Sequence, residues 1–131
     1  MARPTRAQQH TDKANRLAGS YTLLRKRYLT TPPAEADMLS LLAVAQFYEL
    51  VHAAESSLYA RDPQRLESKN HDDRNTQIMS TWGTRASRPY KLVADLAWRA
   101  RYVADAVISA KQIMDAERYA DTFRDVVADN R

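Results

Sequence analysis

The most apolar stretch of the chain, MLSLLAVAQFYELV at residues 38–51, has to be buried on more than one side. The apolar residues of this region cover more than one face of a helix: Leu39, Leu42, Phe47, Leu50, Val51, Ala54 and Leu58. The stretch is shorter than the roughly 20 residues that cross a bilayer, and it contains Gln46 and Glu49. We therefore expect a central helix, from about Pro33 to Tyr59, that other helices cover.

Residues that break helices are scarce in the rest of the chain, which has only two glycines and five prolines in 131 residues. After a frayed polar end at residues 1–9, apolar residues at steps of three and four predict a first helix from about Thr11 to Leu29. Two more helices are expected after Ser87. They should be separated by a break between Ala106 and Ser109, because the apolar pattern is too long for one helix in a small domain.

The apolar pattern is lost between residues 60 and 87, where ARDPQRLESKNHDDRNTQ is polar and only IMSTW, residues 78–82, suggests a helical turn. We interpret this region as a long polar loop between the second and third helices, of the kind that is often functional. The sequence as a whole predicts an all-α fold. Its expected form is an antiparallel four-helix bundle in a single domain of residues 1–131.

Charge and composition narrow the classes of site. Basic residues give a net charge of +4, but acidic residues interrupt most basic clusters, so a solvated surface is favoured over a nucleic-acid footprint. The absence of cysteine excludes disulfides and thiolate metal sites. His10, His52 and His71 show no metal-ligand spacing, and two isolated glycines cannot build a phosphate loop. We expect no metal, no cofactor, no membrane span and a cytoplasmic location.

Four segments resemble, in order, parts of HEPN domains. FYELVHAAESSLY at 47–59 resembles the signature of the second HEPN helix, and LESKNHDD at 66–73 resembles the loop that follows it. RYVADA at 101–106 is similar to an Arg-x-x-Ala-Asp-Tyr segment of one prokaryotic branch, and SAKQIMDAERYADTFRDVV at 109–127 is similar to its final helix. The resemblance implies a HEPN-like helical fold from Ala45 onward.

Many HEPN proteins are metal-independent ribonucleases with an Arg-x(4–6)-His motif in the later helices, usually paired across a dimer. Others are inactive accessory or binding modules. In this chain Asp105 and Ala106 stand where the motif after Arg101 needs a histidine, and no histidine follows His71. Arg65 and His71 have the motif's spacing, but they lie after the second helix. The nuclease motif is therefore absent from its expected place.

The resemblance thus implies a non-catalytic interaction module, or a nucleotide- or RNA-binding module. It would form a homodimer and act as an accessory in a toxin–antitoxin or phage-defence system, with a nucleotidyltransferase-type antitoxin as a possible partner. The alternative is a divergent metal-independent ribonuclease that uses His71 or His52 with Arg65 or Arg101. A helical DNA-binding protein is a weaker third interpretation, because no basic recognition helix stands out.

Five residues are candidates for ligand binding, and two of them lie on the central helix. His52 is one turn from Tyr48 and near Glu55. It either contacts a ligand in a dimer groove, or it is a partly buried histidine bonded to Tyr48, Glu55 or another helix. The structural interpretation is favoured.

The other three candidates lie near the end of the expected third helix. Arg101 and Asp105, with Arg99 beside them, either mark a groove that binds RNA or nucleotide or form a surface ion pair. The ion pair is favoured. Trp82 and Trp98 could stack on bases, but packing in the core or at a subunit interface is favoured for both.

Overall fold

The computed structural model describes residues 3–28, 36–103 and 106–129 of the chain. Over these residues the protein is all-α, without a strand, as predicted. The helices are α1 (Arg6–Tyr28), α2 (Ala36–Arg61), α3 (His71–Trp82), α4 (Thr84–Tyr102) and α5 (Ala110–Asp129). Among these helices, none has the length and apolar character needed to cross a membrane.

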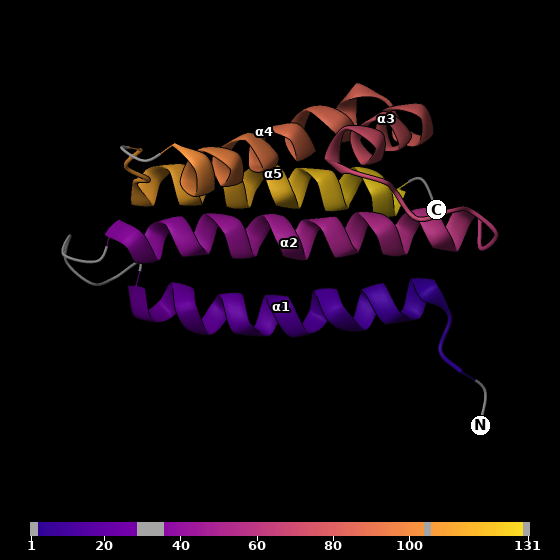
Figure 1. Ribbon diagram of the computed structural model, residues 1–131, viewed down its shortest axis with the longest axis horizontal. Helices are drawn as coiled ribbons and strands as arrows, with labels where there is room; N and C mark the ends of the chain where they lie inside the picture. Colours follow the sequence, from indigo (N-terminus) through magenta and orange to yellow (C-terminus); the bar gives the residue numbers. More distant parts are fainter. Residues whose placement is uncertain (1–2, 29–35, 104–105, 130–131) are drawn as a thin grey trace.

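The long helices run side by side, with α2 in the middle (Figure 1). α1 packs along one side of α2, whereas α4 and α5 pack against each other and against the opposite side. Consecutive long helices, in the order α1, α2, α4 and α5, run antiparallel to each other. The short α3 lies against α4. The prediction of a central second helix is confirmed, since Leu42, Leu50 and Ala54 are all fully buried.

The core has two parts. Among the residues with described side chains, the larger part comes from α2, α3, α4 and α5, and its most enclosed members include Leu50, Ile78, Tyr90 and Phe123. The smaller part lies toward the other end of α2, where Leu42 packs with residues near the start of α5, and Tyr21 is its buried residue from α1. The side chains of α1 that the structure describes therefore contribute little to the main core.

The predicted long polar loop is wrong over residues 71–82, which form α3. The Asn70 side chain caps this helix by accepting a hydrogen bond from the backbone N–H of Asp73 at 2.8 Å. Asp72 and Asp73 lie in the first turn, where the helix dipole favours acidic residues. Because Ile78 is the only fully buried apolar residue of α3, the helix has almost no apolar periodicity for sequence analysis to detect.

Two other helix starts differ from expectation. α1 begins at Arg6, so residues 6–9 are helical rather than frayed. α4 begins at Thr84, directly after Gly83, and Ser87 is a buried residue inside the helix rather than its cap. Gly83 joins α3 to α4 with φ 78° and ψ −169°, a backbone conformation that residues with a side chain rarely adopt.

The predicted break before the last helix is confirmed. α4 ends at Tyr102 and α5 begins at Ala110. Ser109 and Gln112 form a reciprocal cap at the start of α5: the backbone N–H of Gln112 donates to Ser109 Oγ at 3.1 Å, and the backbone N–H of Ser109 donates to Gln112 Oε1 at 2.9 Å.

Candidate functional site

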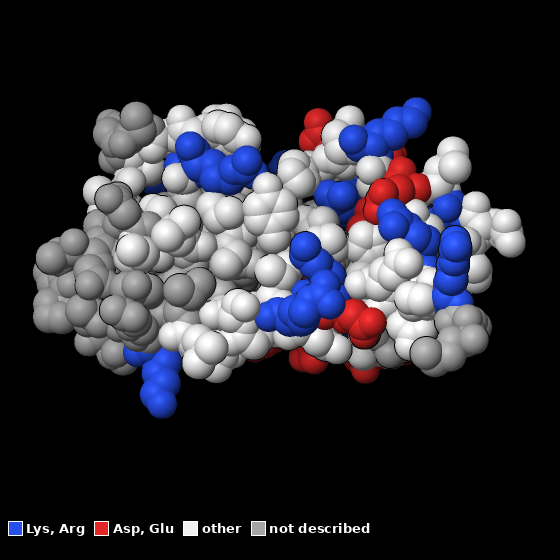
Figure 2. Space-filling model, turned by 60° about the horizontal axis from the view of Figure 1, so that its bottom comes forward, with Lys and Arg blue, Asp and Glu red and all other residues white. Residues whose placement is uncertain are grey.

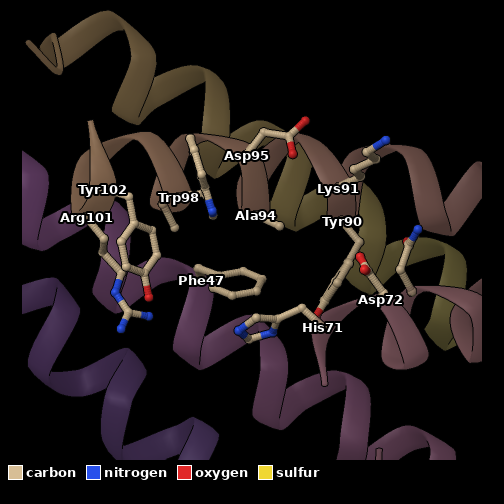
Figure 3. A pocket seen from close by; sticks show the side chains of 12 residues that line it. Phe47, His71, Asp72, Tyr90, Lys91, Ala94, Asp95, Trp98, Arg101 and Tyr102 are labelled. Carbon is tan, nitrogen blue, oxygen red and sulfur yellow. The ribbon is translucent and has the colours of Figure 1, made fainter. Parts of the chain in front are cut away.

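A pocket of about 190 Å³ lies between α2, the start of α3 and α4. Its apolar lining comes mainly from aromatic side chains, and its rim carries both basic and acidic groups (Figure 3). The lining residues are Phe47, His71, Asp72, Asn75, Tyr90, Lys91, Ala94, Asp95, Ala97, Trp98, Arg101 and Tyr102. The pocket brings together two residues that the sequence suggested separately, His71 and Arg101.

Aromatic rings form the inner wall and the open edge of this pocket. Inside, the ring of Phe47 lies 5.0 Å from that of His71 and 5.8 Å from that of Tyr90, measured between centroids. At the edge, Trp98 is 58% exposed and Tyr102 is 59% exposed, with their ring centroids 5.7 Å apart. Of the two kinds of packing expected for Trp98, the one in the core of the chain is therefore wrong, and packing at a subunit interface stays a prediction. Two neighbouring exposed rings beside a cavity are typical of a binding surface.

Arg101 is held at one end of the pocket by two aromatic residues. Its Nη1 donates a hydrogen bond to Tyr48 Oη at 2.7 Å. The guanidinium carbon lies 5.6 Å from the centre of the Tyr48 ring and 5.1 Å from that of Tyr102, within the range of cation–π attraction. Asp105, the expected partner of Arg101, lies outside the described residues. The guanidinium thus presents fixed donors beside the cavity.

Arg99, the neighbouring candidate, does not reach this pocket. It lines a separate shallow hollow between α4 and α5, beside Leu92 and Asp115. Successive residues of a helix point in different directions, and those two positions apart lie on different faces. The structure therefore separates two residues, Arg99 and Arg101, that the sequence analysis grouped.

His71 is fixed in one tautomer by a neighbouring arginine. Arg74 Nη1 lies 3.0 Å from His71 Nδ1. A guanidinium can only donate hydrogen bonds, so Nδ1 must accept, and the proton of the neutral ring resides on Nε2. Burial of part of the ring lowers the pKa of His71, and the positive charges of Arg74 and Arg101 lower it further. His71 is therefore a neutral imidazole whose Nε2–H is left to act as a donor.

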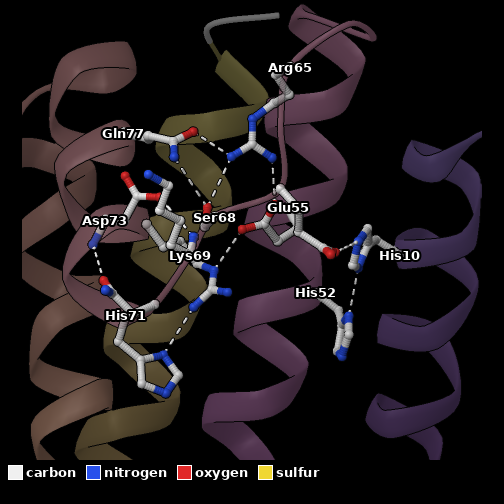
Figure 4. Close-up of polar contacts among 12 residues, drawn as sticks. His10, His52, Glu55, Arg65, Ser68, Lys69, His71, Asp73 and Gln77 are labelled. Carbon is white, nitrogen blue, oxygen red and sulfur yellow. Dashed lines mark hydrogen bonds and ion pairs between the residues drawn. The ribbon is translucent and has the colours of Figure 1, made fainter.

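Arg74 is in turn held by a buried carboxylate. Figure 4 shows this carboxylate, Glu55, facing Arg65. The side chain of Glu55 is 1% exposed and accepts hydrogen bonds from Arg74 Nε at 2.8 Å and from Arg65 Nη1 at 2.5 Å. Burial acts to raise the pKa of Glu55, but hydrogen bonds from Ser68, Arg65 and Arg74 outweigh it and the pKa is lowered. Glu55 is thus a carboxylate clamped between two guanidinium groups.

Arg65, one of the catalytic alternatives, belongs to this network and not to the pocket. Besides Glu55 it donates to Ser68 Oγ at 3.0 Å and to Gln77 Oε1, and its side chain is 8% exposed. Its guanidinium also lies 4.8 Å from the centre of the Tyr59 ring. Arg65 and His71 therefore have the spacing of the HEPN nuclease motif but do not belong to the same site. The contacts of Arg65 instead link the segment that follows α2 to both α2 and α3.

His52 also lies away from the pocket, facing α1. Its Nδ1 is 2.7 Å from His10 Nδ1, and His10 Nε2 is 3.0 Å from Glu67 Oε1. One nitrogen of the facing pair has to donate and the other to accept, so a single proton occupies the contact. Burial lowers the pKa of His52, and the charges of His10 and Lys13 lower it further. Of the partners expected for His52, the one on another helix is confirmed.

The same region contains the one group of possible metal ligands found among the described residues. Ligand atoms of His10, Glu55 and Glu67 lie within 4.8 Å of one another. Both oxygens of Glu55 already accept from arginine, and Arg6 Nη2 donates to Glu67 Oε1 at 2.8 Å. A divalent cation would have to displace or approach these guanidinium groups, so the arrangement is better suited to internal ion pairs.

Sequence analysis missed most of the pocket residues. Lys91, Asp95, Trp98 and Tyr102 follow one another at steps of four, three and four, which places them on one face of α4. That spacing is visible in the sequence, where Trp98 was the only one of the four residues that we singled out. Asn75 carried no such signal, because its position depends on α3, which was not predicted.

Together these features define a protein that is all-helical over the described residues, with a small aromatic pocket that carries a fixed arginine and a neutral histidine. Comparison of the sequence with models of known protein families gave no match. Comparisons with curated proteins and with solved structures gave no match either.

Proposed function

We propose that this protein is a HEPN-like antiparallel four-helix bundle, supplemented by α3, that binds a nucleotide or single-stranded RNA without cleaving it. The observation that carries the proposal is the pocket in which Arg101 and the Nε2–H of His71 stand beside exposed aromatic rings. Arginine donors suit phosphate oxygens, and aromatic side chains stack on bases of any sequence. The pocket therefore offers complementary surfaces to both parts of a nucleotide.

The size of the pocket and the distribution of charge favour recognition of one nucleotide unit over a broad nucleic-acid footprint. A volume of about 190 Å³ is below the roughly 300–1,000 Å³ of cavities that enclose drug-sized ligands, and it suits a single base. On the face shown in Figure 2, Lys and Arg side chains are scattered, with acidic and uncharged surface between them. That face lacks the continuous basic surface on which phosphate-tracking proteins rely.

The state of His71 supports binding over catalysis. General acid–base catalysis needs a group that takes up and releases a proton near the working pH. In His71 the Nδ1 lone pair is occupied by Arg74, Nε2 already carries the proton, and the pKa is lowered away from the imidazolium form. The ring is equipped to donate a hydrogen bond to a phosphate or base oxygen.

A divergent metal-independent ribonuclease is the second candidate, and one observation favours it. His71 and Arg101 line the same pocket, although they are far apart in the sequence. Arginine could stabilise charge on a phosphate and histidine could act on a ribose hydroxyl. This mechanism requires His71 to break its bond with Arg74 and become able to exchange protons.

The proposal includes the biological setting implied by the HEPN resemblance. The protein would be a cytoplasmic homodimer acting as an accessory in a toxin–antitoxin or phage-defence system. Its candidate partner is a nucleotidyltransferase-type antitoxin. Co-expression with such a partner followed by co-purification tests this part independently of ligand binding, and separate elution of the two proteins would contradict it.

Titration of a short fluorescent single-stranded RNA at several salt concentrations tests the binding proposal. We expect salt-dependent binding that Arg101→Ala weakens by about tenfold, because the change removes a charge-assisted phosphate contact. Arg99→Ala is the matched control, since it removes the same charge two residues away, outside the pocket. Equal losses for the two variants would contradict the assignment of the pocket.

The same RNA, recovered after incubation, separates binding from cleavage. We expect intact RNA with the wild-type protein. Fragments that appear with the wild type and disappear with His71→Ala would overturn the non-catalytic proposal in favour of the ribonuclease.

A further inference from the structure

We infer that the pocket selects a base that carries an exocyclic amino group and discriminates against uracil. This inference rests on the nucleotide-binding function proposed above and concerns the identity of the base. It follows from an asymmetry between the two ends of the pocket: one end is built from hydrogen-bond donors, and the other is dominated by acceptors.

The donor end is formed by Arg101 and His71. The Arg101 guanidinium only donates hydrogen bonds, and it is fixed there by Tyr48 and Tyr102. His71 adds Nε2–H, because Arg74 occupies its Nδ1. A phosphate or another group with several acceptor oxygens matches this end.

The opposite end presents acceptor oxygens from two helices. Asp72 belongs to the first turn of α3 and Asp95 to α4, and both line the pocket. In Figure 3, Asp72 and Lys91 lie on the other side of Phe47 from Arg101. An ionised carboxylate accepts hydrogen bonds and cannot donate them. The carboxylates therefore favour N–H groups on whatever part of the ligand reaches this end.

Asn75 adds a third acceptor with a requirement of its own. Asn75 lines the pocket, and its buried Oδ1 makes no hydrogen bond within the part of the chain that the structure describes. Most buried polar atoms in folded proteins have a partner, and leaving one unpaired costs free energy. If the Asn75 amide turns toward the pocket, an N–H group of a ligand supplies that partner.

Lys91 is the one cationic donor among the lining residues at this end. It is exposed, and its positive charge offsets part of the charge of Asp72 and Asp95. Its ammonium is a strongly hydrated group on a flexible chain, whereas the buried Oδ1 of Asn75 has no access to water. The acceptors should therefore dominate the selection.

These features fit a flat ligand with a negative charge at one end and amino donors at the other. Cytosine, adenine and guanine each carry an exocyclic amino group, and acidic side chains accept hydrogen bonds from the cytosine amino group. Uracil has a carbonyl oxygen where cytosine has that amino group. Placed against the Asp72 carboxylate, this oxygen would bring two acceptors together with no proton between them.

Cytidine and uridine 5′-monophosphates are the sharpest pair of probes, because they share the phosphate, the sugar and the ring size. We expect the cytidine nucleotide to bind about tenfold more tightly, measured by calorimetry or by quenching of tryptophan fluorescence. Asp72→Asn replaces one acceptor oxygen by an amide NH₂ of the same size, and Asp95→Asn does the same from α4. Each change should narrow the ratio between the two affinities, whereas Asp121→Asn, on exposed α5 surface, should leave it unchanged.

The outcomes distinguish the two proposals. Equal affinity for both nucleotides, or preference for the uridine nucleotide, overturns the base selection while the nucleotide-binding function stands. Failure of both to bind, with the thermal melting of the wild type intact, overturns the nucleotide-binding function and the base selection with it. A preference for cytidine that neither aspartate variant alters would also overturn the inference, because the selection would then arise elsewhere.

Discussion

The buried ion pairs of Glu55 make its replacement by glutamine the most informative single change in the protein. Glu55→Gln keeps the size of the side chain and removes its charge. The guanidinium groups of Arg65 and Arg74 would then lie 8% and 10% exposed without the carboxylate that balances them. Removing one partner of a buried ion pair is strongly destabilising, because the charge that remains is buried without compensation. Replacing the whole network by well-packed neutral residues would not carry this cost.

The expected loss in the free energy of unfolding is about 3–5 kcal/mol, the usual cost of removing one partner from a buried ion pair. Glu55 has two such partners, but either guanidinium can turn toward solvent once it is released, so the figure should not be doubled. Equilibrium unfolding in urea, followed by circular dichroism, measures the change. The same variant should shift the ring nitrogens of His71 in NMR spectra, because Arg74 orients that ring.

Asp115→Asn is the control for this experiment. It makes the same carboxylate-to-amide change in a group that pairs with Lys111 and Arg118 at the surface of α5, where solvent screens the charges, so stability should hardly change. The reasoning is refuted if Glu55→Gln is as harmless as this control, since the network would then contribute no more than a surface ion pair.

Three further predictions concern pH, the α3–α4 turn and the attachment of α1. The pKa values of His52 and His71 are lowered on folding from their ordinary 6.5, so below that pH the unfolded chain binds more protons than the folded one. The melting temperature should therefore decrease as the pH is lowered from about 7.5 to 5.5. A melting temperature that does not change over this range would contradict the lowered pKa values of the two histidines. Gly83→Ala should lower the free energy of unfolding in urea by about 1–3 kcal/mol. The cost comes from the backbone angles at this position, because an added Cβ meets no atom within 4 Å. An unchanged unfolding midpoint would contradict this backbone strain. Tyr21→Phe should lower the free energy of unfolding by about 1.5 kcal/mol, since it removes the 3.0 Å hydrogen bond to Glu117 of α5. Thr22→Ala, at the neighbouring exposed position, is the control, and a smaller loss for Tyr21→Phe than for this control would contradict the contact.

Much of the fold could be predicted from the sequence where local pattern and burial agree. The apolar faces of α2 are so extensive that a central position was the only reasonable interpretation, and Ser109 with Gln112 marks the start of α5 by spacing alone. α3 could not be predicted in the same way. It packs through one buried isoleucine, and the ion pair of Arg74 with Glu55 joins it to α2. Neither interaction produces a periodic pattern of apolar residues in the sequence.

The site was predictable only in pieces. Arg101 and Tyr48 were recognised separately, and the fold joins them through a hydrogen bond between α4 and α2. His71 was assigned to a loop because its helix was missed, which hid its place beside Arg101. Arg65 suggested catalysis through its spacing from His71, yet the buried charge of Glu55 draws its side chain away from the pocket.

The edge position of α1 has a consequence for how this molecule comes apart. None of the described side chains of α1 belongs to the larger core, and polar contacts such as those of His10 with His52 and of Tyr21 with Glu117 tie the helix to the others. Opening of α1 should thus be a local event that needs less free energy than global unfolding. The pKa of His52 is lowered in the folded state, so mild acid favours states in which His52 is released from α1. Acid should therefore detach this outer helix first and expose one flank of α2 while the remaining helices stay assembled.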